Sequence, residues 1–218
     1  MFLGEIKLTI TVDLLHTNSQ IQNEIHRILA KELDKKINKN RNKVIKPFKQ
    51  AIEGWLLQSP EINSLLSQGE EGSLNAVFGL SPGSGPSAVS SIISTVANSV
   101  EIKLSKISPK NLSGGIEFRF QNTDFSDLLS LPQGRQITEL GGDLHWLDWL
   151  LTKGDAVIVK GFFYDPSNEG RSGGGTMKVG GTFRVPPVFS GTVDNNFITR
   201  AFQNRDTQIS KILSLILK

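Results

Sequence analysis

Apolar residues recur at helical spacing between Ile21 and Ile37, and this pattern stops where a dense run of lysines begins. The spacing of three and four residues predicts a long amphipathic helix, for which Asn18 or Ser19 provides the N-cap. Pro47 should interrupt or kink this helix, because proline lacks the backbone N–H that a helix needs. We expect the first half of the helix to pack on a sheet and its lysine-rich second half to project from it.

Alternation of apolar and polar residues predicts strands in several parts of the chain. The predicted strands cover residues 5–15, 100–104, 116–120, 156–163 and 177–185. The second and third of these strands form a hairpin, and a loop joins the last two. An amphipathic helix is predicted at the C-terminal end, over residues 207–218. Together the patterns predict an α+β fold, in which an antiparallel β-sheet packs with helices.

Proline, glycine and serine mark the boundaries of further helices. Ser59, Pro60 and Glu61 form a strong start signal, because serine caps a helix, proline suits its first position and an early carboxylate favours its dipole. Additional helices are predicted over residues 74–80, 87–98, 124–131 and 143–154. Residues 81–86 contain two prolines and two glycines and form a chain breaker. We therefore divide the chain into an N-terminal strand and helical region, 1–80, and an α+β core with the C-terminal helix, 81–218, within one structural domain.

The composition excludes several classes of protein. The chain has no cysteine, which excludes a disulfide framework, a cysteine nucleophile and thiolate metal sites. No apolar run approaches the roughly 18 to 20 residues that a membrane span needs, and the first residues lack the order of a signal peptide. We expect a protein that folds in a reducing cytoplasm, has no contact with membranes and gains part of its stability from neighbouring subunits.

Eight Lys and Arg residues and two acidic residues lie between positions 31 and 49, although the whole chain carries a net charge of only +3. The candidate basic patch consists of Lys35, Lys36, Lys39, Arg41, Lys43 and Lys46. Such a patch can contact DNA phosphates without sequence preference, which makes a DNA-binding accessory protein the alternative function. Only Phe48 interleaves with these charges, so an aromatic platform for single strands is missing. A solvated face, or one that meets an acidic subunit, is the favoured interpretation.

No catalytic set is recognisable, and we expect neither an enzyme nor a cofactor or metal site. His145 lies between Asp143 and Asp148, but a metal site needs three or four ligands that converge, and we expect Asp143 to cap a helix instead. The glycine-rich loop over residues 170–176 could hold a phosphate through backbone amides. It lacks the lysine of a Walker motif and precedes a strand, which favours a flexible hairpin tip that orders against a partner.

Trp146 and Trp149 lie on the predicted helix over residues 143–154, among several leucines. Apolar groups therefore occupy most of the circumference of this helix, which needs burial on more than one side. We assign Trp146 to the core and Trp149 to a subunit interface, because tryptophan is enriched in interface hot spots.

Several segments of the C-terminal third, taken in order, carry a resemblance to a known class of proteins. The segments are Leu147-Asp148-Trp149-Leu150-Leu151 with Gly154-Asp155, Arg171-Ser172-Gly173 with Met177, Arg184-Val185-Pro186-Pro187 with Gly191-Thr192, and Asn196-Phe197-Ile198-Thr199-Arg200-Ala201. Over roughly residues 125 to 205 this order resembles virion morphogenesis proteins of long-tailed bacteriophages and prophages, and is similar to their neck or tail-completion class.

The resemblance implies a structural virion protein that forms a homo-oligomeric ring, with a hexamer favoured, at the head–tail junction. Tail terminator, tail-completion factor and head-side connector are the roles it implies. Its partners would be other neck, connector and tail-tube proteins and the DNA that passes through the ring, after synthesis in the cytoplasm of the bacterial host. The candidate subunit interface consists of Trp146, Trp149, Arg171, Ser172, Gly173, Arg184, Pro186, Pro187, Phe197 and Arg200.

Overall fold

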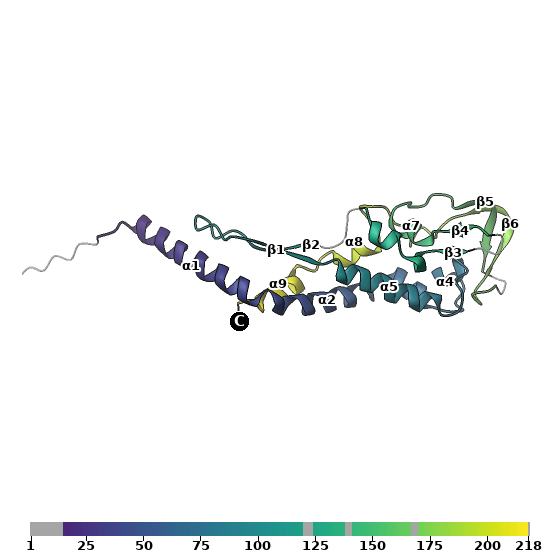
Figure 1. Ribbon diagram of the computed structural model, residues 1–218. Coiled ribbons are helices and arrows are strands. Elements are labelled where there is room, and N and C mark those ends of the chain that lie inside the picture. The colour runs from purple at the N-terminus through teal and green to yellow at the C-terminus, as the bar shows by residue number, and fades with distance from the viewer. Residues whose placement is uncertain (1–14, 120–123, 138–140, 167–169, 218) are drawn as a thin grey trace, which may run out of the picture. The chain divides into compact units, whose positions relative to one another are not determined.

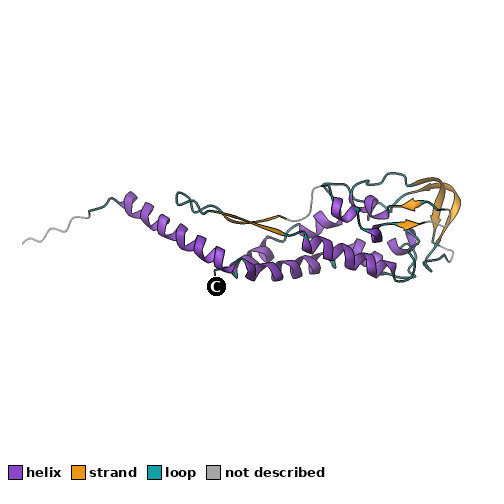
Figure 2. Cartoon of the chain, in the orientation of Figure 1, coloured by secondary structure: helices purple, strands orange, loops and turns teal. Residues whose placement is uncertain are grey.

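The computed structural model describes residues 15–119, 124–137, 141–166 and 170–217, and it has the predicted α+β fold (Figure 1 and Figure 2). The helices are α1 Asn18–Asn40, α2 Asn42–Leu56, α3 Pro60–Leu66, α4 Leu74–Val77, α5 Ser84–Asn98, α6 Ser126–Leu129, the 3-10 turn η1 Pro132–Gly134, α7 Trp146–Leu151, α8 Phe197–Phe202 and α9 Asp206–Ser214. The strands are β1 Glu101–Ser105, β2 Gly115–Arg119, β3 Gln136–Ile137, β4 Asp143–Leu144, β5 Val159–Asp165 and β6 Thr176–Phe183. They pair in order as three two-stranded sheets. The strand predicted over residues 5–15 lies, except for its last residue, outside the described part of the chain.

The chain divides into two compact units. The helix–hairpin unit consists of residues 1–39 and 104–117, and the main unit consists of residues 40–103 and 118–218. The boundary falls inside both β1 and β2. The predicted chain breaker lies within the main unit, where residues 81–83 precede α5 and residues 84–86 form its first turn, so the second half of the breaker is helical.

The core of the main unit lies among α2, α3, α5, α7 and α8. Its largest fully buried side chains include Trp146, Phe48 and Phe197. The predicted start of α3 is confirmed, with Ser59 in the N-cap position and Pro60 as the first helical residue. The N-terminal end of α5 approaches the end of α3 so closely that a Cβ on Gly85 would overlap the carbonyl oxygen of Leu65.

In the helix–hairpin unit, the turn between β1 and β2 packs on α1. The Asp34 carboxylate accepts a hydrogen bond from the backbone N–H of Ile107 at 3.0 Å, and Ala30 is buried. These contacts lie in the second half of α1, whereas Ile21 and Ile25 in the first half are exposed. Within the described residues, the expectation that the apolar first half packs on a sheet was wrong.

Two local predictions for the N-terminal helices also differ from the structure. Thr17, rather than Asn18 or Ser19, caps α1, because its hydroxyl accepts from the N–H of Gln20 while the Gln20 side chain accepts from the N–H of Thr17. The helix breaks at Arg41, and Pro47 lies inside α2.

The amphipathic C-terminal helix is confirmed as α9, which packs against α2. The Trp55 indole N–H donates to the Gln208 side chain, and the Arg205 guanidinium lies 5.6 Å from the centre of the Trp55 ring. Just beyond α9, the carbonyl of Ile216 accepts from the buried side chain of Asn40 at 2.8 Å. The third tryptophan therefore fixes the last helix to the main unit.

Candidate assembly surface

The β5–β6 hairpin forms a separate two-stranded sheet at the end of the main unit that also holds α4 (Figure 1). Its antiparallel register places Phe162 opposite Val179 and Tyr164 opposite Met177. Opposite residues share a face of a sheet, as do alternate residues of one strand. These four side chains therefore lie on one face, and Phe163 lies on the other.

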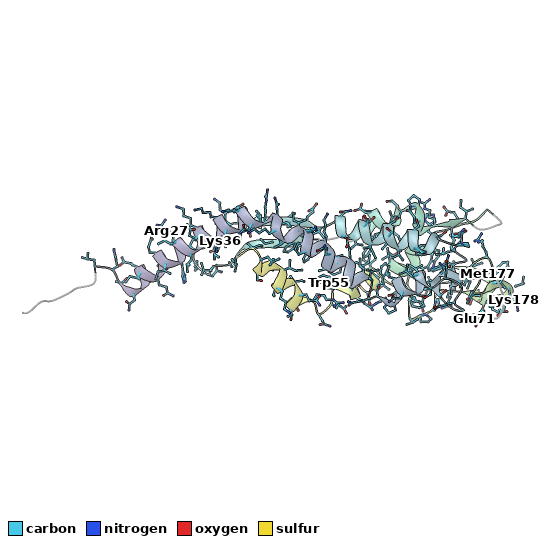
Figure 3. The ribbon with its side chains drawn as sticks, turned by 90° about the horizontal axis from the view of Figure 1, so that it is seen from below. Arg27, Lys36, Trp55, Glu71, Met177 and Lys178 are labelled. Atoms are coloured by element: carbon cyan, nitrogen blue, oxygen red, sulfur yellow. The ribbon has the colours of Figure 1, made fainter. Side chains whose placement is uncertain are left out.

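Apolar side chains of this hairpin are open to solvent. We call the exposed set, which comprises Val159, Phe162, Phe163, Met177 and Val179, the hairpin surface. Val179 is 83% exposed, and the other four side chains are 37% to 40% exposed. Figure 3 shows Met177 and Lys178 at this end of the main unit. Three of them, Phe162, Met177 and Val179, are neighbours on one face of the hairpin. Neighbouring exposed apolar side chains are typical of protein–protein contact sites, so the hairpin surface is the strongest candidate for assembly among the described residues.

Tyr164 fastens the hairpin to the loop that precedes α4. Its hydroxyl donates to the carbonyl of Gly174 at 2.5 Å and accepts from the backbone N–H of Gly72 at 2.9 Å. The tyrosine ring also fills the space beside Gly175, where a Cβ would overlap it. The bond to Gly174 closes the loop of the hairpin itself, and the bond from Gly72 attaches the hairpin to the segment before α4.

The glycine-rich loop is packed against the end of α4. The Arg171 guanidinium donates to the carbonyl of Gly79 at 2.7 Å and 3.0 Å, and buried Ser172 donates to the carbonyl of Ala76 at 3.5 Å. A Cβ on Gly174 would lie only 2.7 Å from that of Ala76. The last carbonyls of a helix lack partners within the helix, which explains why this loop finds acceptors there. Residues 170–175 therefore differ from the free hairpin tip that we expected.

The two tryptophans of α7 differ in exposure. Trp146 has no exposed surface, and its ring centre lies 5.5 Å from that of Phe78. Trp149 is half-buried and packs against the same core. The indole N–H of each is buried and donates to no group in the described part of the chain. The full burial of Trp146 agrees with its assignment to the core and leaves it no surface for the candidate subunit interface, whereas the interface role of Trp149 stays a prediction.

Asn196, which the sequence analysis did not single out, joins α7 to α8. Its side-chain N–H groups donate to the carbonyls of Leu151 at 3.3 Å and Thr192 at 2.9 Å. Its side-chain oxygen accepts from the N–H groups of Ile198 and Thr199. The Thr199 hydroxyl in turn accepts from the Asn196 N–H, which completes a capping box. An asparagine followed by threonine three positions later was the available sequence signal.

Gly191 also joins the segment before α8 to α7, through backbone hydrogen bonds. Its N–H donates to the carbonyl of Trp149 at 3.2 Å, and its carbonyl accepts from the N–H of Gly154 at 2.8 Å. A Cβ on Gly191 would overlap the carbonyl of Leu150. Several residues that carry the resemblance therefore hold α7 and α8 together.

Arg200 of α8 binds a buried carboxylate. One of its nitrogens lies 2.5 Å from Oε1 of Glu61 in the first turn of α3, and Glu61 is almost fully buried. The second nitrogen donates to the side chain of Asn195 at 2.9 Å. Phe197 on the same helix has no exposed surface. These two predicted interface residues thus have structural contacts inside their own chain.

The remaining predicted interface residues lie around the end of β6. Arg184 is exposed and donates to the carbonyl of Asp155 at 3.4 Å. Pro186 is half-buried, and its carbonyl accepts from the N–H of Phe189, whereas Pro187 is exposed. Arg171 and Gly173 are likewise exposed, in contrast to buried Ser172.

The candidate basic patch is exposed but belongs to two units. Lys35, Lys36 and Lys39 lie on α1, whereas the other three residues lie at position 41 and on α2. Lys31, Lys35 and Lys39 follow one another at intervals of four residues, which places them on one face of α1. We call these three residues the lysine stripe.

The cluster around His145 has partners that do not form a metal site. Asp143 lies in β4, where its carboxylate is 3.1 Å from Nε2 of His145, so its predicted role as the cap of α7 was wrong. The Asp148 carboxylate accepts from the Thr152 hydroxyl and lies 3.6 Å from the Lys153 ammonium. Among the residues that the structure describes, no group of three His, Asp or Glu side chains could hold a metal ion.

None of the described helices combines the length and the apolar character that crossing a bilayer requires. Comparison of the chain with models of protein families, with curated proteins and with solved structures finds no match.

Proposed function

We propose that the chain is a structural subunit that assembles with copies of itself and with neighbouring proteins through the hairpin surface. In this proposal the assembly is a ring in the neck of a tailed bacteriophage virion, in a tail-completion, tail-terminator or connector role. The ring is a hexamer, its neighbours are neck, connector and tail-tube proteins, and the protein has no catalytic activity.

The observation that carries the assembly part is the solvent exposure of five large apolar side chains on a hairpin that is fixed to the main unit. A fixed apolar surface suits association, because little conformational entropy is lost when a partner covers it. The phage neck is supported by the resemblance of the ordered segments over residues 125–205 to proteins of that class.

A charged residue introduced into the hairpin surface tests whether this surface mediates assembly. Val179→Glu should leave the far-ultraviolet circular dichroism unchanged and should markedly weaken self-association in sedimentation velocity, because a carboxylate would be buried in the contact. Thr182→Glu is the matched control, since Thr182 is an exposed polar residue of the same strand. Normal assembly of Val179→Glu would reject the hairpin surface as the contact.

The virion part requires location of the subunit in particles. Cryo-electron microscopy of virions that contain a tagged copy should place the tag between head and tail. Density for the tag at the capsid or the tail tip, or its absence from purified particles, would contradict the neck role.

The lysine stripe favours DNA binding as the second candidate. Three exposed ammonium groups on one face of α1 suit a phosphate backbone. If DNA is the main ligand, the affinity of the purified protein for duplex DNA should fall steeply with salt, and Lys35→Glu with Lys39→Glu should abolish binding. Weak binding that these changes do not affect would exclude this alternative.

A further inference from the structure

The first half of α1 presents an apolar stripe to solvent. Ile21, Ile25 and Ile28 share one face of the helix because of their spacing of four and three residues, and Leu29 borders them. Each of these side chains is between 38% and 51% exposed. We call these four residues the α1 stripe.

The main unit carries an open groove of about 420 Å³ between α2 and α5. Its lining includes the apolar side chains of Leu57, Leu66, Val89 and Ile93 and the small residues Ser90, Ser94 and Ala97. Leu57 and Leu66 are themselves substantially exposed. Small residues on α5 allow a helix to approach closely, and the surrounding leucines and isoleucine match aliphatic side chains on that helix.

Charged residues flank both surfaces in a complementary order. Glu24 and Arg27 lie beside the α1 stripe, three residues apart, where Arg27 donates to the Glu24 carboxylate and lowers its pKa. Lys49 and Glu53 line the groove four residues apart. A spacing of three residues along a helix is about 4.5 Å and one of four residues is about 6 Å, so the two pairs fit within side-chain reach.

The connection between the helices argues against occupation of the groove by the stripe of the same chain. Arg41 alone separates α1 from α2. Antiparallel neighbouring helices are joined by loops of about 2 to 5 residues, so one residue is too short for α1 to fold back along α2.

From these observations we infer that the α1 stripe of one subunit docks in the α2–α5 groove of a second copy of this chain. The docked helix runs parallel to α2, with Glu24 beside Lys49 and Arg27 beside Glu53 of the second copy. This inference rests on the proposed assembly role and adds to it a contact distinct from the hairpin surface. Because stripe and groove are different surfaces, the contact is heterologous, and its repetition closes a ring if the rotation between subunits allows closure.

Two variants that each block one side test this contact in the full-length protein. Ile25→Glu places a charge in the stripe and leaves the groove intact, whereas Ser90→Glu places a charge in the groove and leaves the stripe intact. Each variant alone should associate at least ten-fold more weakly than the unchanged protein in sedimentation velocity. When both variants also carry Val179→Glu, which blocks the hairpin surface, their equimolar mixture should form a heterodimer and nothing larger, because one intact stripe and one intact groove remain.

Matched controls separate this contact from general effects of charge. Asn23→Glu on α1 and Ser87→Glu on α5 add the same charge to exposed residues outside the stripe and the groove, and both should associate normally. In a further pair, Glu24→Lys and Lys49→Glu should each weaken association, and their combination in one chain should restore it.

The outcomes distinguish this inference from the proposed function. If Val179→Glu weakens assembly while Ile25→Glu and Ser90→Glu assemble normally, the stripe–groove contact is rejected and the proposed function stands. The contact is also rejected if the mixture of the two blocked variants stays monomeric. It is likewise rejected if the protein is a monomer and Ile25→Glu unfolds it, since the stripe would then be covered within its own chain. If the two variants behave as expected and the tagged subunit lies outside the neck, the contact stands and the proposed role is rejected.

Discussion

The guanidinium of Arg200 lies 2.5 Å from the carboxylate of Glu61, and this pair links α8 to the first turn of α3. The second carboxylate oxygen of Glu61 is buried and has no protein partner among the described residues. The charge of Glu61 therefore depends on Arg200 for its compensation.

Replacement of Arg200 by methionine should lower the free energy of unfolding by roughly 3 kcal/mol, because it leaves a buried carboxylate without its counter-charge. Urea denaturation followed by circular dichroism measures this loss. The double variant Glu61→Gln with Arg200→Met should recover part of the stability. If Arg200→Met unfolds at the same urea concentration as the unchanged protein, the ion pair contributes nothing.

Asn196→Ala should destabilise the protein by roughly 2 to 3 kcal/mol, since it removes the cap of α8 and the side-chain donor to the buried carbonyl of Leu151. The nearby change Asp194→Ala is the control. It affects an exposed side chain and should cost about 0.5 kcal/mol or less. Equal losses for both variants in thermal denaturation would show that the hydrogen bonds of Asn196 are not the cause.

Tyr164→Phe removes the hydroxyl that connects the hairpin to Gly72 and Gly174 and keeps the aromatic ring beside Gly175. We expect global stability to fall by about 1 kcal/mol and hydrogen exchange to accelerate at the N–H of Gly72 and in β6. Exchange in α2 and α5 should stay unchanged. Uniform acceleration across the main unit would mean that the hairpin does not open separately.

The tryptophans of α7 should differ when each is replaced by alanine. Trp146→Ala should cost roughly 3 to 5 kcal/mol, because the whole side chain is buried, and this loss is enough to unfold a marginal domain. Trp149→Ala should cost less folding stability and, if the exposed part meets a neighbour, roughly 2 kcal/mol in association. Circular dichroism and sedimentation velocity of both variants decide the matter. A Trp149→Ala protein that is folded and assembles normally would remove Trp149 from the interface.

Periodicity predicted most of the helices and strands correctly, because residues such as Ile92 and Val96 repeat at the spacing of the element they form. Periodicity did not predict that Pro47 lies inside a helix, because the break at Arg41 places this proline in α2. The position of the break depends on how α2 packs. Periodicity also misplaced the buried half of α1. An amphipathic pattern shows that a face is apolar and does not show which segment covers it.

The candidate site was predictable only in part. The alternation of apolar and polar residues predicted the two strands of the β5–β6 hairpin. The packing of this hairpin near α4 depends on Arg171 and Tyr164, whose partners lie 92 residues away in the chain. The proximity of Glu61 and Arg200, which are 139 residues apart, likewise arises from tertiary packing alone. Asn196 was missed because a single capping asparagine gives a weaker sequence signal than the aromatic and charged residues around it.

The glycines at positions 85 and 191 press against the carbonyls of Leu65 and Leu150, where a side chain of any size would collide with the main chain. Substitution of either glycine therefore requires a shift of the neighbouring main chain, whatever the chain binds. Together with Asn196, they form a fingerprint that a distant relative with this fold should retain after its surface has diverged. A search weighted on these three positions and on their distances along the sequence could thus detect kinship that overall identity no longer reveals.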